Sequence, residues 1–190
     1  MGRKKVIKGN NDVYPIKLER VIANTPTTRN NLSGGYVNYG QRNNFPDQLL
    51  NLLAQSPTLS SCVNFCVTAL VGGGVDYEAM GYDGSQLMPN YRMTWDSFIR
   101  RISFDYFVFG SFAVQVIKNR DGRTYSFYPQ SFNTVRAGIP DDDGVVNSYY
   151  VCRDWSATSR NPVIEIPSLV ARGDEQWDIK SGEPYLFVPE

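Results

Sequence analysis

The apolar positions of this chain follow two different periods, and the period changes at Gly110. Before Gly110, apolar residues recur three and four positions apart, as they do along one side of an α-helix. After it, Phe112, Val114 and Val116 alternate with their neighbours, which is the period of a β-strand. The order predicts helices followed by a meander of antiparallel strands, an α+β fold and not an alternating βαβ fold.

The first helix is predicted from about Pro46 to Gln55. Proline at the first helical position loses no hydrogen bond, and Asp47 suits the positive end of the helix dipole. We expect its buried face to consist of four leucines: Leu49, Leu50, Leu52 and Leu53.

The second helix is predicted to follow at once, with Ser56 as its N-cap and Pro57 as its first residue. It ends at three consecutive glycines, Gly72, Gly73 and Gly74. One apolar stripe runs along it and consists of Leu59, Cys62, Val63, Cys66, Ala69 and Leu70. We therefore interpret Cys62 and Cys66 as buried thiols of a protein that folds in reducing cytosol.

A third helix is predicted from a Thr94 N-cap to the residues before Gly110. Phe104, Phe107 and Val108 lie to one side of its main stripe, so this helix should be covered on more than one face. Either the same chain or a second subunit supplies that cover. The predicted strands beyond it are 112–117, 124–128, one opening at 135, 145–152, 162–166 and 184–188.

Positive charge is concentrated at the start of the chain. Residues 1–42 contain eight Lys and Arg against two acidic residues, a net charge of +6, whereas the whole chain has a net charge of zero. Residues 1–12 read as a basic arm, 13–22 as a short strand or helix, and 24–35 as a loop or linker. Four residues of the arm could contact phosphates or a neighbouring subunit, or could simply form a solubilising tail: Arg3, Lys4, Lys5 and Lys8.

Catalytic patterns are weak throughout the sequence. The chain has no histidine, the usual general base and the usual partner of a Ser or Cys nucleophile. Gly72 to Gly74 follow a helix and lack the Gly-Lys-Ser/Thr ending of a phosphate loop, and Asp141 to Asp143 fit a solvated turn. With three cysteines and no histidine we expect no metal site, no cofactor and no enzyme. No apolar run reaches the length of a membrane span, so we expect a soluble protein.

The order of several short motifs resembles that of phage portal proteins, from about Tyr39 to Gly138. The matching residues are Asn44-Phe45-Pro46, Ser56-Pro57, Gly72-Gly73-Gly74, Trp95-Asp96-Ser97-Phe98, Asp105, Gly110, Gln115 and the 132–136 segment that ends in Arg136. The resemblance implies a structural subunit of a ring, commonly twelvefold, that forms the capsid vertex channel for DNA packaging and ejection. Its implied partners are further copies of itself, the terminase motor, capsid protein, a tail adaptor and double-stranded DNA. Its implied location is the virion, after assembly in the cytoplasm of a bacterial host.

In such a subunit these residues belong to the outer wing. The resemblance divides the chain into a basic flexible arm and linker (1–35), a wing core of helices and hairpin (36–138) and a β-rich extension (139–190). The sequence up to residue 190 shows neither a long stem helix nor a clip pattern, so we expect either a truncated piece of a longer subunit or a relative that kept only the wing. The end within a predicted strand favours truncation.

Two other classes stay open from sequence. A non-catalytic protein- or carbohydrate-binding α+β module would use exposed Tyr and Trp side chains between residues 125 and 177. A histidine-free hydrolase would need two carboxylates within about 10 Å of each other across a cleft, and the sequence indicates no such pair.

Overall fold

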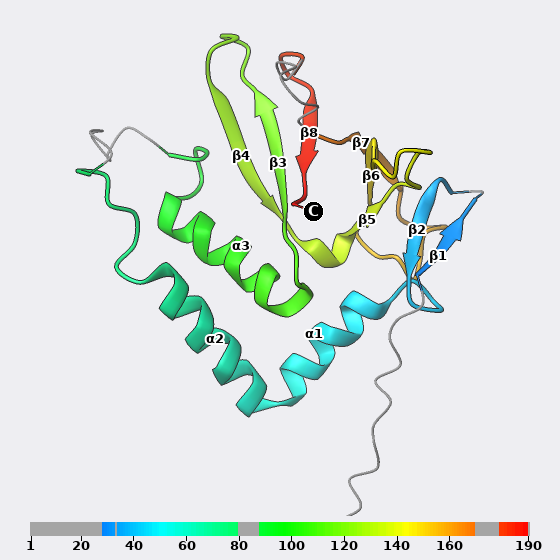
Figure 1. Cartoon of the computed structure of the whole chain (residues 1–190), viewed down its shortest axis with the longest axis horizontal. Coiled ribbons are helices and arrows are strands. Elements are labelled where there is room, and N and C mark those ends of the chain that lie inside the picture. Colours follow the sequence, from blue (N-terminus) through cyan, green and yellow to red (C-terminus); the bar gives the residue numbers. More distant parts are fainter. Residues whose placement is uncertain (1–27, 33, 80–87, 170–178, 190) are drawn as a thin grey trace, which may run out of the picture.

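The computed structural model describes residues 28–32, 34–79, 88–169 and 179–189, and the predictions for the arm and for residues 13–22 lie outside these ranges. Within them the chain has three α-helices and eight strands in three sheets, and every strand pair within these sheets is antiparallel. The predicted α+β class with a β meander is therefore confirmed (Figure 1). None of the helices in these ranges is both long and apolar enough to cross a membrane.

The helices begin and end where the sequence predicts. They are α1 (Phe45–Gln55), α2 (Pro57–Val71) and α3 (Trp95–Phe109). The Ser56 hydroxyl accepts a hydrogen bond of 3.3 Å from the Leu59 N–H, and this cap separates α1 from α2. Thr94 caps α3 in the same way, through the Ser97 N–H at 3.3 Å. Gly110 ends α3 with φ at 78°, a left-handed conformation that glycine adopts without strain.

The strands form a hairpin and two three-stranded sheets. The hairpin pairs β1 (Thr28–Asn31) with β2 (Tyr36–Tyr39). One sheet has the order β4-β3-β8, formed by β4 (Tyr125–Gln130), β3 (Ala113–Lys118) and β8 (Pro184–Phe187). The other has the order β5-β6-β7, formed by β5 (Val135–Ala137), β6 (Ser148–Val151) and β7 (Ile164–Pro167). A short 3-10 turn, Phe132–Thr134, connects β4 to β5.

The hairpin differs from the sequence prediction. Residues 24–35 read as a loop, yet Thr28 to Asn31 form β1 and pair with β2 in register from Thr28 opposite Tyr39 to Asn31 opposite Tyr36. These residues are polar, so they lack the apolar alternation that predicts a strand. Tertiary pairing with β2 determines their conformation, and β2 in turn packs beside β5 through a bridge between Tyr36 and Gly138.

Three apolar clusters lie within the described residues, and the smallest joins Tyr36, Cys152 and Trp155. The largest packs α3 on the β4-β3-β8 sheet and is centred on Phe98, Val114 and Val116. The second lies between the two three-stranded sheets and includes Val135, Tyr149 and Leu186. Leu186 has no exposed surface, because β8 pairs with β3 and also bridges to Ser168 after β7.

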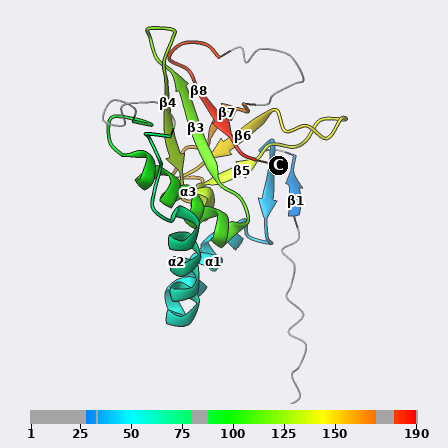
Figure 2. The same ribbon diagram turned by 60° about the vertical axis from the view of Figure 1, so that its left-hand side comes forward.

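The helices α1 and α2 form a corner that projects from this body. Figure 1 shows α1 leaving the β1–β2 side and turning sharply into α2, which returns alongside α3. In the view turned by 60° the corner extends below the sheets, and only α3 lies between α2 and the strands (Figure 2). The corner therefore packs on α3 through α2, and its base, the start of α1, contacts the Phe132–Thr134 turn.

Candidate assembly surface

Most of the apolar surface of α2 faces away from the protein body. Phe65 is 73% exposed and Leu70 is 59% exposed, although both are large apolar side chains. They belong to what we call the α2 stripe: Leu59, Cys62, Phe65, Cys66, Ala69 and Leu70. At 3.6 residues per turn these six positions cover an arc of roughly 140°. No residue of α2 carries a charge.

This finding corrects two sequence predictions. Cys62 is exposed and Cys66 is half-buried, so the prediction of two buried thiols was wrong; Cys152 is the buried cysteine. On α1 the predicted buried face is also only partly correct, because Leu53 is buried whereas Leu52 is 57% exposed. The reason is common to both helices. The sequence correctly predicts an apolar stripe, but none of the residues that the structure describes covers it.

The opposite edge of α2 is held by α3. Val67 is the buried residue of α2, and Thr68 accepts a hydrogen bond of 3.5 Å from Arg100 on α3. A shallow groove of about 320 Å³ remains between the two helices, lined in part by Val67 and Phe104. The predicted cover of α3 thus comes largely from the same chain. Tyr106 and Phe107 of α3, however, remain 50% and 38% exposed.

The base of α1 is held by a buried arginine. Arg136 on β5 has no exposed surface. Its guanidinium donates to the Asn43 carbonyl oxygen at 2.7 Å, to the Asn43 side-chain oxygen, to the Asn133 carbonyl oxygen at 2.9 Å and to the Val135 carbonyl oxygen at 2.7 Å. Tyr39 and Trp155 lie over it, with ring centroids 5.0 and 4.8 Å from the guanidinium carbon. We call these contacts the Arg136 node.

The charge of Arg136 is balanced by dipoles and aromatic faces, because none of its four hydrogen-bond acceptors is a carboxylate. Burial lowers the pKa of Arg136 from its usual value to about 10, while nearby Tyr39 and Asp47 act in the opposite direction. Burial also raises the pKa of Tyr39. The guanidinium remains charged at neutral pH, so any change that removes an acceptor leaves a buried cation poorly solvated.

The node joins two motifs that lie far apart in the sequence: the Asn44-Phe45-Pro46 segment and the 132–136 segment that ends in Arg136. Asn43 precedes the Asn44-Phe45-Pro46 segment and has φ at 55°, and its side-chain oxygen also accepts from the Tyr39 N–H at 2.9 Å. Asp47 on α1 accepts a hydrogen bond of 3.0 Å from Asn133, next to the node. Sequence reasoning selected Arg136 but missed Asn43, Tyr39 and Trp155. The one indication in the sequence was the pair Asn43-Asn44, because asparagine tolerates the positive φ that Asn43 adopts.

Asp105 of α3 forms a hydrogen bond to the segment that precedes the Arg136 node. It is a buried acid that accepts a hydrogen bond of 2.9 Å from the Phe132 N–H. Burial raises the pKa of Asp105, and the Phe132 N–H and the charge of Arg101 oppose this shift without cancelling it. Because the pKa is raised in the folded state, the contribution of this carboxyl to stability is greatest below its unfolded pKa and is lost as the pH rises through the folded pKa.

We therefore expect opposite results from two substitutions of Asp105. Asp105→Ala removes the acceptor of the Phe132 N–H and should lower the free energy of unfolding by about 1–3 kcal/mol. Asp105→Asn keeps an acceptor and removes the buried charge, so at pH 7 it should be at least as stable as the natural chain. The gain should disappear as the pH falls toward 4. Urea denaturation at several pH values measures both; an Asn variant as unstable as the Ala variant at pH 7 would contradict this account.

The other predicted site residues are placed as follows. Gly72 is the C-cap of α2, donating to the Thr68 carbonyl oxygen at 2.9 Å, and Pro46 is buried at the start of α1. Asp141 accepts from the N–H groups of Asp143 and Val145 in its own exposed turn, as a solvated turn requires. Arg3, Lys4, Lys5 and Lys8 lie outside the described residues.

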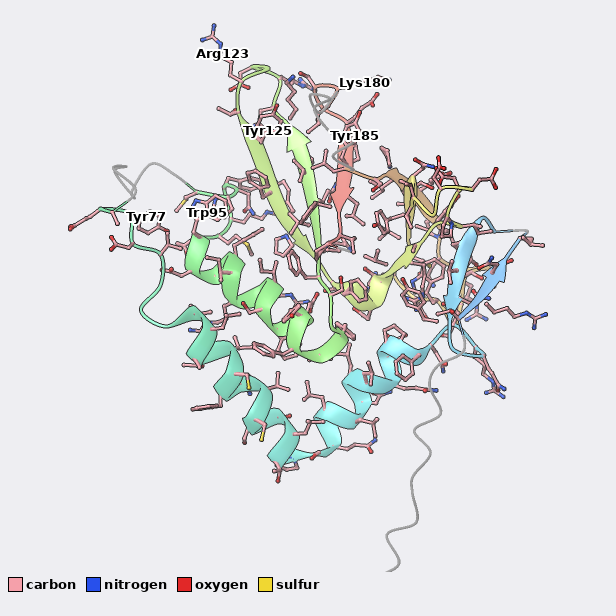
Figure 3. All side chains as sticks on the ribbon, viewed as in Figure 1. Tyr77, Trp95, Arg123, Tyr125, Lys180 and Tyr185 are labelled. Atoms are coloured by element: carbon pink, nitrogen blue, oxygen red, sulfur yellow. The ribbon has the colours of Figure 1, made fainter. Side chains whose placement is uncertain are left out.

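The aromatic side chains between 125 and 177 do not form one exposed platform. Trp155 is 5% exposed and belongs to the Arg136 node, and its indole N–H donates to the Thr134 carbonyl oxygen at 2.9 Å. Tyr149 is also buried, whereas Tyr125 is 40% exposed near the tip of the β3–β4 hairpin (Figure 3). Trp177 lies outside the described residues. The described aromatics therefore give little support to a carbohydrate-binding face.

The fold and the exposed helical corner define an α+β protein whose most distinctive surface is apolar. No protein-family model matches the chain, and no curated protein matches its sequence. The likeness to portal proteins thus rests on the order of the motifs alone.

Proposed function

We propose that this chain is the wing region of a phage portal subunit, a structural component of a ring at the capsid vertex. The observation that carries the proposal is the α2 stripe. A large exposed apolar surface on a soluble protein indicates an interaction site. In a ring, each subunit presents one surface to a different surface of its neighbour, so a stripe that is uncovered in one copy can be covered in the assembly.

The internal contacts support the same assignment. The Arg136 node holds the base of α1, and α3 holds the edge of α2, so the stripe is presented by a body that is fixed at both ends. The motifs that resemble those of portal proteins lie at the node and at the ends of the helices: Asn44-Phe45-Pro46 at the start of α1, Gly72 at the end of α2, Gly110 at the end of α3, and Arg136 itself. Their roles here are structural, as a ring subunit without catalysis requires.

In this proposal the subunit assembles in the host cytoplasm into a ring, commonly twelvefold, and becomes part of the virion. The partners are further copies of the chain, the terminase motor, capsid protein, a tail adaptor and double-stranded DNA. These partners come from the resemblance to portal proteins.

Electron microscopy of the protein produced from its complete reading frame tests the proposal. We expect closed rings with a central channel. A monodisperse monomer over the concentration range of assembly would overturn it. Native mass spectrometry of the same sample gives the number of subunits and checks that rings are not aggregates.

A further inference from the structure

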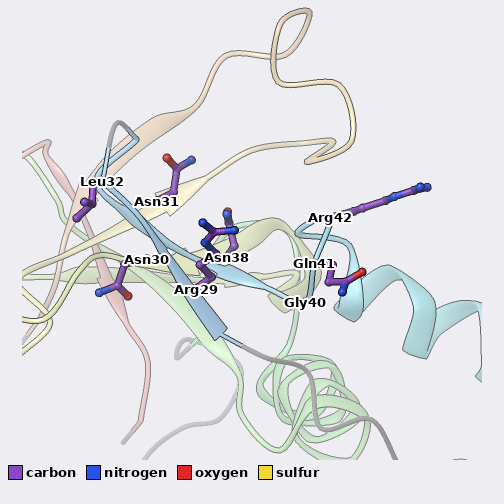
Figure 4. A pocket seen from close by; sticks show the side chains of 8 residues that line it. All are labelled: Arg29, Asn30, Asn31, Leu32, Asn38, Gly40, Gln41 and Arg42. Carbon is purple, nitrogen blue, oxygen red and sulfur yellow. The ribbon is translucent and has the colours of Figure 1, made fainter.

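A polar groove lies along the β1–β2 hairpin, apart from the α2 stripe. It has a volume of about 980 Å³ and is lined by Arg29, Asn30, Asn31, Leu32, Asn38, Gly40, Gln41 and Arg42. Arg29 and Asn38 are register partners on the two strands, and their side chains lie next to each other in Figure 4. The Arg42 side chain extends from the segment after β2, beyond Gly40 (Figure 4). In Figure 4 Gln41 lies between Arg29 and Arg42, and Asn30 and Asn31 lie on the other side of Arg29, so the two cations alternate with side-chain amides.

The groove has an excess of positive charge. Both arginines are exposed, and the described residues of its lining include no carboxylate. No hydrogen bond or ion pair joins Arg29 or Arg42 to another residue in the described ranges. The chain that leads into β1 continues this charge, because residues 1–27 contain six Lys and Arg against Asp12 and Glu19. Together with Arg29 and Arg42, residues 1–42 carry a net charge of +6. Since the whole chain is neutral, residues 43–190 carry a net charge of −6.

These side chains are suited to the phosphate backbone of a duplex. Guanidinium and amide N–H groups are the donors that proteins use for phosphate oxygens. Proteins that hold single strands add aromatic side chains on which bases stack, and no aromatic residue is found among the described lining residues. A lipid surface would need apolar side chains that insert beside the cations, and within the described part of the lining Leu32 is the one large apolar residue.

We propose that the β1–β2 groove binds the phosphate backbone of double-stranded nucleic acid, without sequence preference, through Arg29 and Arg42. The inference deepens the proposed function, on which it rests for its biological setting, since it names a surface of the subunit that meets the duplex. The chemistry itself requires only the described hairpin.

Duplex binding by the 190-residue chain tests the groove. The measurement is fluorescence anisotropy of a short labelled duplex across about 50 to 200 mM salt. The groove variant is Arg29→Gln with Arg42→Gln, in which the arm is intact. A matched control is Arg120→Gln with Arg123→Gln, which removes the same charge from two exposed arginines at the β3–β4 turn. Loss of two phosphate contacts should reduce the slope of log K against log salt by about 2 and weaken binding at least fivefold.

Several outcomes would overturn the inference. Equal duplex binding by the groove variant and the control variant would assign any affinity to net charge or to the arm. Equal affinity for a single strand of the same length would contradict the inference that the groove binds a duplex specifically. Binding to phosphatidylglycerol vesicles that depends on Arg29 and Arg42, without duplex binding, would assign the groove to a membrane surface.

The ring and the groove can be tested separately. The groove variant should form the same rings as the natural chain when it is introduced into the complete protein, since neither arginine belongs to the α2 stripe. Duplex binding that depends on the groove, without ring formation, would support the duplex-binding inference and contradict the proposed portal function. Ring formation with no change of duplex affinity in the groove variant would support the proposed portal function and contradict duplex binding by the groove.

Discussion

Replacing Arg136 by alanine is expected to lower the free energy of unfolding by roughly 3–5 kcal/mol, the largest effect of any single substitution proposed here. The change removes a fully buried side chain and leaves the carbonyl oxygens of Asn43, Asn133 and Val135 without its donors. It also opens a cavity between Tyr39 and Trp155, because both rings lie over the guanidinium. Urea denaturation monitored by tryptophan fluorescence measures the loss, and Trp155 reports on the node itself.

Arg136→Lys distinguishes the geometry of the node from its charge. Lysine keeps a cation but lacks the planar fork that reaches acceptors on both sides, so we expect a loss of about 2 kcal/mol or more. Arg120→Lys, at an exposed turn, serves as the control and should change stability by less than about 0.5 kcal/mol. If Arg136→Lys were as stable as the control, charge alone would account for the node and its hydrogen-bond geometry would not matter.

The second large effect concerns assembly. Phe65→Gln combined with Leu70→Gln is expected to abolish ring formation by the complete protein while the fold of a single subunit stays intact. Both side chains are more than half exposed, so their replacement should change the unfolding free energy little. At an interface, however, each anchor of this type contributes about 2 kcal/mol, roughly 30-fold in affinity, and the effect is repeated at every contact around a ring.

A matched control makes this test specific. Tyr125→Gln combined with Ile164→Gln also replaces two exposed apolar side chains, 40% and 56% exposed, on strands away from the helical corner. Electron microscopy and sedimentation should show rings for the control and single subunits for the stripe variant. Rings formed equally well by both variants would mean that the α2 stripe does not lie between subunits.

Local rules were sufficient for the helices and most of the strands. Ser56, Thr94 and Gly110 fix helix ends through their own side chain or backbone conformation, so their effect is readable in sequence. The β3–β4 pair could be predicted because Asn119-Arg120-Asp121-Gly122 forms a tight turn between two alternating segments. Each of these predictions depends on residues within a few positions of one another.

The candidate site could not be predicted in the same way. An apolar helical stripe indicates that something covers it, but periodicity cannot distinguish a core of the same chain from a partner, and Cys62 was therefore placed wrongly. Arg136 could be recognised only as part of a short motif, because two of its four acceptors belong to Asn43, 93 positions away. The polar strand β1 exists only through its pairing with β2, which no local pattern records.

The Arg136 node also has a consequence for the kinetics of folding. Its contact with Asn43 joins residues 93 positions apart, so closing it requires a large loss of chain entropy and belongs to the later stages of folding. When it opens, the hairpin and the start of α1 lose a shared anchor, whereas the core under α3 keeps its own contacts. Partial opening should thus release the N-terminal elements as one cooperative unit before global unfolding, and amide hydrogens of β1, β2 and α1 should exchange earlier than those of β3.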